Sequence, residues 1–269
     1  MMNNARELSV IHPDARIGEN VTVGPFTFID KDVEIGDNTW IGPNVTIFDG
    51  ARIGKNVQIH PGAVVSGIPQ DLKFEGEITT AEIGDGSIVR EYVTINRGTK
   101  HAMRTVVGKN CLLMAYSHVA HDCRLGDHVI LANNVSLAGH VVIEDWAILE
   151  GLVAVQQFTE IGKHSFIAGG SLVRKSVPPF VRAAREPLRY IGVNSIGLTR
   201  RGFTQEQAHL IHEIFRVIFV KGYNLSHALE VVEASVKPSD ERDAILEFIR
   251  RNQKSGIIRG YNSSDVYED

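Results

Sequence analysis

The chain has 269 residues, of which 43% are hydrophobic and 22% are charged, and its formal net charge is −4 at pH 7. These values are typical of a globular protein of one or two domains and exclude an intrinsically disordered chain. The small negative charge also excludes bulk attraction to nucleic acid or an anionic membrane, so an anionic ligand would need a local basic patch.

The N-terminal segment, residues 1–10, contains no basic stretch followed by an apolar one, so we expect no secretory signal peptide. No later segment is apolar over the length that a membrane-spanning helix requires. We therefore expect a cytoplasmic protein without a transmembrane segment.

A six-residue repeat of Ile, Val or Leu begins at Ile11. It runs through residues 11–65, 83–95 and 107–173 without a polar residue at its first position. A hexapeptide period of this length is typical of a parallel β-helix, in which three hexads form one triangular coil. Coils stack at about 4.8 Å, so residues 18 apart in the sequence become vertical neighbours. Glycines such as Gly18 and Gly36 follow the apolar position, and we expect them at corners where φ is positive.

The two cysteines, Cys111 and Cys123, both fall at the fifth position of a hexad, which points into the coil. Small apolar side chains suit this place, and a free thiol behaves as one. Neither the number nor the spacing of the cysteines indicates a disulfide framework or a zinc knuckle.

Two segments leave the repeat, at residues 66–82 and 98–106. Insertions in such a repeat emerge as loops, often on the binding face. The first insertion carries Asp71 and Lys73. We assign residues 9–179 to a mainly β domain, a parallel β-helix with these two loop insertions.

The hexad repeat stops at Pro178 and Pro179, and an apolar period of about 3.6 residues follows. Thr204 and Gln207 form a capping box that begins the first of three amphipathic stripes. We therefore assign residues 180–269 to a small C-terminal α-helical domain.

The 18-residue period brings a group of polar residues to one edge of the coil. His121 stacks on Gly139 and then on Gln157, and Asp122 stacks on His140. A neutral histidine beside a carboxylate can take a proton from a hydroxyl. A glycine one coil away can offer its N–H to an oxyanion. This equipment fits acyl transfer to an alcohol by direct attack, because no serine or outward-pointing cysteine offers a covalent nucleophile.

Other interpretations of the same residues remain. His118 and His121, with His140 one coil away, are similar to the zinc ligands of hexapeptide-repeat carbonic anhydrases. A zinc site needs three converging ligands, and His118 and His121 occupy hexad positions that face different ways, so we expect no metal. A non-catalytic structural repeat with a solvated His121 is the simplest alternative.

A second column consists of residues without bulk. Such a strip is either a shallow groove for an extended chain or a set of corner residues chosen for their backbone geometry. Its members are Ala115, Asn133, Gly151 and Gly169.

Several strings together resemble the UDP-N-acetylglucosamine O-acyltransferases, a family of hexapeptide-repeat enzymes of the lipid A pathway. The resemblance implies a homotrimer of left-handed β-helices with active sites between subunits. It also implies transfer of an (R)-3-hydroxyacyl chain from acyl carrier protein to the 3-hydroxyl of UDP-N-acetylglucosamine, without a cofactor besides the carrier's phosphopantetheine. The strings are QDLKFEGE (70–77), HVAHDC (118–123), ILANN (130–134), LAGHV (137–141), VPPF (177–180), GVNSIGL (192–198) and RRGF (200–203).

The resemblance also implies roles for individual residues. His121 would be the general base, Asp122 its orienting partner and Gly139 the oxyanion donor. Gly169 would form the floor of the acyl groove beside Gly151 and leave room for a long chain. The implied substrate contacts are Asp71 and Lys73 for the sugar and acyl group, His118, His140 and Gln157 for the sugar nucleotide, and Asn194, Arg200 and Arg201 for the nucleotide, with Arg201 alternatively serving carrier docking. Basic side chains after the repeat, Arg216 and Lys221, are further candidates for docking the acidic carrier.

Two positions depart from the family pattern. Gln156 stands where well-studied members have histidine, and Ile196 stands where they have glutamate. The first change leaves open whether the acceptor is a 3-hydroxy or a 3-amino UDP-sugar, and the second affects the expected nucleotide contact. An acetyl-CoA-dependent acetyltransferase of the same fold is the remaining alternative.

Overall fold

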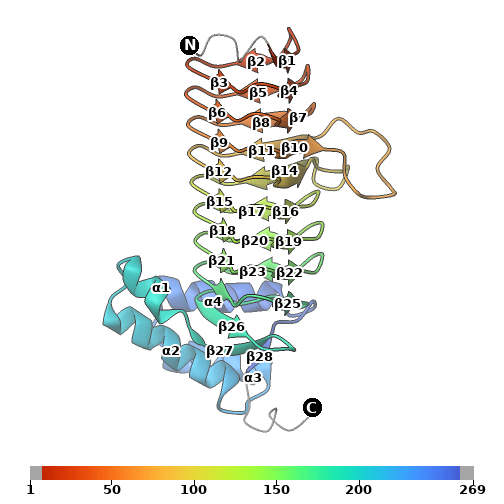
Figure 1. Cartoon of the computed structure of the whole chain (residues 1–269). Helices are drawn as coiled ribbons and strands as arrows, with labels where there is room; N and C mark the ends of the chain where they lie inside the picture. The colour runs from red at the N-terminus through yellow and green to blue at the C-terminus, as the bar shows by residue number, and fades with distance from the viewer. Residues whose placement is uncertain (1–7, 261–269) are drawn as a thin grey trace.

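The computed structural model describes residues 8–260, which form a column of stacked coils with four helices packed at its C-terminal end (Figure 1). Short parallel strands build three sheets along the column. Sheet A contains β1 (Val10–Ile11), β4 (Phe28–Ile29), β7 (Thr46–Ile47), β10 (Val64–Gly67), β13 (Thr94–Asn96), β16 (His118–Val119), β19 (Ser136–Leu137), β22 (Ala154–Val155) and β25 (Leu172–Val173).

The other two sheets complete each triangular coil. Sheet B contains β2 (Arg16–Ile17), β5 (Glu34–Ile35), β8 (Ala51–Ile53), β11 (Thr80–Ile83), β14 (Arg104–Val107), β17 (Arg124–Leu125), β20 (Val142–Ile143) and β23 (Glu160–Ile161). Sheet C contains β3 (Thr22–Val23), β6 (Trp40–Ile41), β9 (Gln58–Ile59), β12 (Ile88–Val89), β15 (Leu112–Leu113), β18 (Ile130–Leu131), β21 (Ile148–Leu149), β24 (Phe166–Ile167), β26 (Val181–Ala184), β27 (Arg189–Val193) and β28 (Arg259–Gly260).

The strand register confirms the predicted 18-residue coil. Val119 pairs with Leu137, and Leu137 pairs with Val155. These apolar positions are buried in the column, since Val119 is 0% and Leu137 is 1% exposed. The interior is therefore a continuous ladder of Ile, Val and Leu, which stabilises each coil only through its neighbours.

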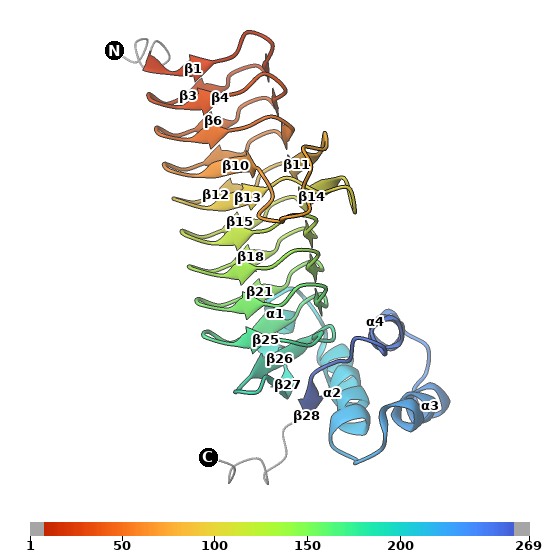
Figure 2. The ribbon, with the colours of Figure 1, turned by 90° about the vertical axis from the view of Figure 1, so that its right-hand side faces the viewer.

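The insertions lengthen two coils. Residues 68–79 connect β10 to β11, and residues 97–103 connect β13 to β14, so the ends of the off-frame segments belong to strands. Each follows a strand of sheet A, and both therefore leave the column at the same corner (Figure 2). We call the turns from sheet A to sheet B the A–B corner, and name the B–C and C–A corners in the same way.

The expectation of positive φ at the repeat glycines is wrong. The left-handed positions come two residues later and carry residues such as Asn20 and Asn38, at φ of 56° and 58°. Gly18 is required for a different reason: a β-carbon there would lie 2.9 Å from Ile35 O of the next coil. Close stacking of coils, and not backbone conformation, selects glycine at this position.

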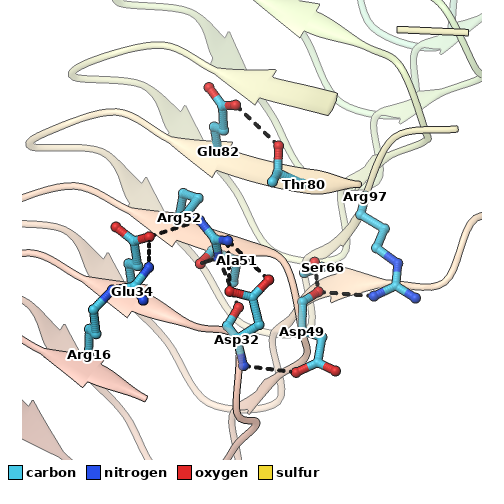
Figure 3. Close-up of polar contacts among 10 residues, drawn as sticks. All are labelled: Arg16, Asp32, Glu34, Asp49, Ala51, Arg52, Ser66, Thr80, Glu82 and Arg97. Atoms are coloured by element: carbon cyan, nitrogen blue, oxygen red, sulfur yellow. Dashed lines mark hydrogen bonds and ion pairs between the residues drawn. The ribbon is translucent and has the colours of Figure 1, made fainter. Parts of the chain in front are cut away.

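The three outer faces of the column differ in polarity. Sheet B carries a ladder of charged residues, in which Arg52 bonds Asp32 at 2.8 Å and Glu34 at 3.2 Å, and Arg16 pairs with Glu34 (Figure 3). Sheet C instead presents half-buried apolar side chains over five consecutive coils. They are Ile88, Leu112, Ile130, Ile148 and Phe166.

The C-terminal segment begins as sheet and becomes helical only at Ser195. β26 pairs parallel with β24 directly after Pro178 and Pro179, and β27 returns antiparallel to β26, so sheet C continues past the two prolines. The capping box of Thr204 and Gln207 is confirmed. The helices are α1 (Ser195–Arg200), α2 (Gln205–Phe219), α3 (Leu225–Ser235) and α4 (Asp240–Arg251).

None of the helices within residues 8–260 has the length and apolar character needed to cross a bilayer. The two cysteines lie in the interior as free thiols, in agreement with the sequence. Burial raises the pKa of Cys111 to about 11 and that of Cys123 to about 12, so both thiols stay protonated at neutral pH.

Candidate active site

The A–B corner brings together the residues predicted from the 18-residue period. His121 and Asp122 follow β16, Gly139 and His140 follow β19, and Gln157 follows β22. Backbone hydrogen bonds lock these turns together, because His140 N donates to His121 O at 3.1 Å. The cluster is therefore held by the coil stacking itself and not by a flexible loop.

His121 and Asp122 form a hydrogen-bonded pair. His121 Nδ1 lies 2.8 Å from Asp122 Oδ2, and the Asp122 side chain is fully buried. An ionised carboxylate can only accept, so His121 Nδ1 carries the proton and Nε2 offers its lone pair. The hydrogen bond thus defines the tautomer of the neutral ring and leaves Nε2 as its basic nitrogen.

The second insertion holds the Asp122 carboxylate. Thr99 donates twice, from its N–H to Oδ1 at 2.9 Å and from its hydroxyl to Oδ2 at 2.6 Å. The Ala102 N–H donates to Oδ1 at 3.2 Å. Burial raises the pKa of Asp122, but the hydrogen bonds from Thr99, His121 and Ala102 outweigh it and hold this pKa below the ordinary value. Asp122 is therefore ionised, and the second insertion supports its carboxylate.

The free edge of the His121 ring faces Gly139. A β-carbon on this glycine would lie 2.7 Å from His121 Nε2, so the ring occupies the space that a side chain would need. The Gly139 N–H finds no acceptor among residues 8–260. An unpaired amide next to a basic nitrogen is the arrangement that an oxyanion and its attacking hydroxyl require.

The B–C corner shows how an amide at this hexad position can be capped. There the amides at the same hexad position are capped by aspartates of the next coil: Lys55 N donates to Asp85 Oδ1 at 2.8 Å, and Lys109 N donates to Asp127 Oδ1 at 2.7 Å. No such aspartate follows Gly139 on the A–B corner, where the next coil has Gln157. The Gly139 amide therefore lacks the cap that aspartates supply on the B–C corner.

Two further histidine rings surround the pair. The His140 ring stacks on Phe158 at 4.4 Å and meets His101 edge-on at 4.7 Å. Burial lowers the pKa of His140, and the charge of Asp122 only partly offsets this. His101 was not predicted, because it lies in an insertion where the period gives no neighbour.

The three histidines considered as zinc ligands, His118, His121 and His140, do not converge on one point. His118 Nδ1 instead bonds Thr94 Oγ1 at 2.7 Å on the outer face of sheet A. Among residues 8–260, the group close enough to hold a metal is His121, Asp122 and His140, whose ligand atoms lie within 4.8 Å of one another. Because Asp122 is already bonded to His121 Nδ1, an ion there would compete with the pair that supplies the base.

The first insertion reaches the cluster only in part. The Asp71 charge raises the pKa of His140, which places this carboxylate within electrostatic range. Lys73 is exposed, and its backbone N–H bonds Asp71 Oδ1 at 3.0 Å. The loop between β10 and β11 projects from the column (Figure 1).

The predicted nucleotide contacts lie at a different corner. The Asn194 side chain accepts from Gly197 N at 3.3 Å to cap α1 and donates to His164 O at 2.9 Å. Arg201 Nη1 lies 3.4 Å from His164 Nδ1, and its guanidinium lies over Trp146. His164 and Trp146 belong to the B–C corner, so a single chain does not bring these residues to His121.

The remaining candidates are surface residues. Arg200 ends α1 and is exposed, as is Lys221 after α2. Arg216 pairs with Glu213 at 2.6 Å, so part of its charge is neutralised. Ile196 is 67% exposed on α1. The structure groups these residues around α1 and α2, away from the A–B corner.

The column of small residues stacks as predicted, on the C–A corner. A β-carbon on Gly151 would lie 3.4 Å from Asn133 O, and one on Gly169 would lie 3.1 Å from Gly151 O. This corner borders the opposite edge of sheet A from His121. Between the two edges, the outer face of sheet A carries the small residues Ser136 and Ala154. A chain could therefore cross the sheet without meeting bulk, although corner geometry alone explains the glycines equally well.

Comparison with known proteins supports the family resemblance. Residues 177–258 match a family model described as the second domain of UDP-N-acetylglucosamine O-acyltransferase, and residues 32–67 and 104–139 match the bacterial transferase hexapeptide model. The acyl-[acyl-carrier-protein]–UDP-N-acetylglucosamine O-acyltransferases of Stenotrophomonas maltophilia (strain R551-3) and Xanthomonas oryzae pv. oryzae (strain PXO99A) are 40% and 45% identical. The alignments cover 94% of this chain and 98% of the first relative, and 92% and 95% for the second.

Solved structures give the same result. The UDP-N-acetylglucosamine acyltransferase LpxA of Bacteroides fragilis 9343 is 50% identical, with a TM-score of 0.92 over 94% of this chain and 98% of that one. The Francisella novicida enzyme is 40% identical, with a TM-score of 0.92 over 97% and 96%. These similarities confirm the predicted fold class, a left-handed parallel β-helix followed by helices. At such identity over nearly the full length, the chain belongs to the UDP-N-acetylglucosamine O-acyltransferase family.

Proposed function

We propose that this protein transfers a 3-hydroxyacyl chain from acyl carrier protein to the 3-hydroxyl of UDP-N-acetylglucosamine, the first step of lipid A biosynthesis. The observation that carries the proposal is the pairing of His121 with buried Asp122, one coil from the free amide of Gly139. Curated relatives of 40% to 45% identity are named for this reaction.

In the proposed mechanism, His121 Nε2 removes the proton of the acceptor hydroxyl as its oxygen attacks the thioester carbonyl. The Gly139 N–H receives the oxyanion of the tetrahedral intermediate. When the intermediate collapses, the C–S bond breaks and the imidazolium returns its proton to the departing thiolate. Asp122 stays ionised throughout and stabilises the imidazolium.

The Cys123 thiol lies near the cluster but is unsuited to form a covalent acyl-enzyme. Cys123 is buried, its Sγ donates to Ala138 O at 3.1 Å, and burial raises its pKa to about 12. A thiol in this state is a poor nucleophile. Direct attack by the sugar hydroxyl therefore fits the site better, and the reaction needs no cofactor of its own because the donor carries phosphopantetheine.

A cytoplasmic homotrimer is part of the proposal. The apolar outer face of sheet C and the charged face of sheet B suit an assembly that buries the first and exposes the second. Asn194 and Arg201 lie at the B–C corner, so a neighbouring copy would have to bring them to the A–B corner of His121. Mass measurement of the purified protein in solution tests the trimer.

One assay tests the reaction. The purified protein is incubated with a mixture of 3-hydroxyacyl carrier proteins and both UDP-N-acetylglucosamine and its 3-amino analogue, and the products are identified by mass spectrometry. We expect the O-acylated sugar with a long acyl chain, consistent with the glycine at position 169. Exclusive use of the amino sugar would show that the acceptor is a 3-amino sugar and would connect this preference with Gln156. Turnover with acetyl-CoA alone would overturn the proposal.

A further inference from the structure

A pocket lies at the C-terminal end of the A–B corner. Lys175 occupies the same hexad position as Gly139 and Gln157, each 18 residues apart, and follows β25 as Gly139 follows β19. Two coils at roughly 4.8 Å each place its backbone about 10 Å below Gly139 along the column. A ligand that reaches the Gly139 amide from this end of the column would pass Lys175.

This pocket has a volume of about 220 Å³, an apolar floor and a basic rim. Leu172 and Leu188 contribute to the floor, and the charged side chains of its lining are Arg174, Lys175, Arg189 and Arg259. No acidic side chain of residues 8–260 lines it.

The charge of this rim is only partly balanced. Arg174 pairs with Glu186 at 2.5 Å, where both side chains are about half exposed. Lys175 and Arg259 are exposed, and neither forms an ion pair with a residue of the described chain. The positive charges gathered in this pocket repel one another, and an anion bound between them would offset the repulsion.

We propose that this pocket binds the phosphodiester of the phosphopantetheine arm that presents the acyl donor. The inference rests on the proposed function, because it assumes a donor carried on such an arm. The arm joins a phosphate at its base to a thioester at its tip through a flexible chain that includes a dimethyl group. Arginine and lysine bind the phosphate, and the floor of Leu172 and Leu188 receives the methyl groups.

The acceptor also carries phosphates, but its nucleotide is expected elsewhere. Arg200 and Arg201 lie beside α1, with Arg201 on the B–C corner. Lys175 lies on the A–B corner, in line with the oxyanion amide. The two anionic substrates therefore have separate basic sites, and the experiment below distinguishes them.

The test compares three donors: 3-hydroxyacyl carrier protein, 3-hydroxyacyl-phosphopantetheine and 3-hydroxyacyl-pantetheine, which lacks the phosphate. We expect the unaltered protein to use the phosphorylated arm with a kcat/KM about tenfold above that of the arm without phosphate, the size of one charged hydrogen bond. The double variant Lys175→Glu and Arg259→Glu should lose this preference, with kcat/KM for acyl-pantetheine and the KM for UDP-N-acetylglucosamine unchanged. Lys175→Arg, which retains the charge, should keep the preference.

Lys31→Glu is the matched control. Lys31 occupies the same hexad position of the A–B corner as Lys175 at the opposite end of the column and is exposed, and Lys31→Glu reverses one charge as Lys175→Glu does. An equal preference for phosphate in the double variant and the unaltered protein would overturn the inference, as would a change confined to the KM of the nucleotide sugar. Failure of the proposed function is a separate result, because the unaltered protein would then use none of the three donors.

Discussion

The imidazole of His121 fills the space beside the Gly139 α-carbon, where a β-carbon would lie 2.7 Å from Nε2 and 2.6 Å from Cε1. The glycine is therefore needed for the base as well as for the oxyanion. Its φ is outside the left-handed region, so alanine fits the backbone and only the ring has to move. We predict that Gly139→Ala lowers kcat by about 10²-fold or more, the range of a lost general base, while the thermal midpoint changes little. Steady-state kinetics and thermal melts test this, and full activity in a folded variant would refute the role of the glycine.

Removing the base itself gives a complementary prediction. His121→Ala deletes the ring whose Nδ1 bonds Asp122 and whose Nε2 faces Gly139. We expect kcat to fall by about 10²–10⁴-fold, with a smaller effect on the KM of the acceptor. Circular dichroism and the mass of the assembly should match those of the unaltered protein. His227→Ala on the exposed face of α3 serves as the control, and an unchanged rate for His121→Ala would remove this residue from the mechanism.

Thr99 provides a test of the Asp122 support. Thr99→Val keeps the shape but removes the hydroxyl that donates to Oδ2 at 2.6 Å. Because the pKa of folded Asp122 lies below its ordinary value of 3.8, its contribution to stability is present above that pH and is lost as the pH falls through the folded pKa. The variant raises the folded pKa and should lower the free energy of unfolding by about 1.5–3 kcal/mol near neutral pH, the value of a hydrogen bond to a charged group.

Denaturant unfolding at a fixed protein concentration, repeated from pH 7 downward, measures this difference. We expect it to shrink as Asp122 becomes protonated, and kcat of Thr99→Val to fall at neutral pH. Thr99→Ser restores the donor and should recover both properties. A deficit that is the same at every pH would indicate lost packing and would contradict the proposed role of the hydroxyl.

The 18-residue period predicts the part of the site that the repeat builds. It places Gly139 one coil from His121 and His140 one coil from Asp122, because each coil adds one rung of fixed height. It cannot place Thr99 and His101, which lie in an insertion whose path depends on tertiary contacts with Asp122 and His140. The sequence gives no signal for these two residues, because their contacts with the site are made outside the repeat.

The C-terminal segment shows a second limit of the sequence. Pro178 and Pro179 indicate a stop, yet β26 pairs with β24 through Ile167 and Ala183, with an offset that differs from the coil repeat. Sheet C resumes because β26, the strand after the prolines, can pair with the edge that β24 already provides. Asn194 illustrates the same point at a single residue: the family motif implies a nucleotide contact, and the structure uses both side-chain groups to cap α1 and to hold the B–C corner.

His164 allows a prediction about acid stability. Its ring stacks between Trp146 and Phe180, and burial, together with the charges of Arg201 and Lys163, lowers its pKa from 6.5 to about 4. Between these two values the unfolded chain binds a proton that the folded protein excludes, so the free energy of unfolding decreases as the pH falls. His164→Phe keeps an aromatic ring in the stack and removes the titration. Within this pH window, the slope of the unfolding free energy against pH should therefore decrease by up to about 1.4 kcal/mol per pH unit, which is the value for one proton. Denaturant titrations at several pH values between 4.5 and 7.5, at constant protein concentration, measure the two slopes, and identical slopes would show that His164 titrates equally in both states.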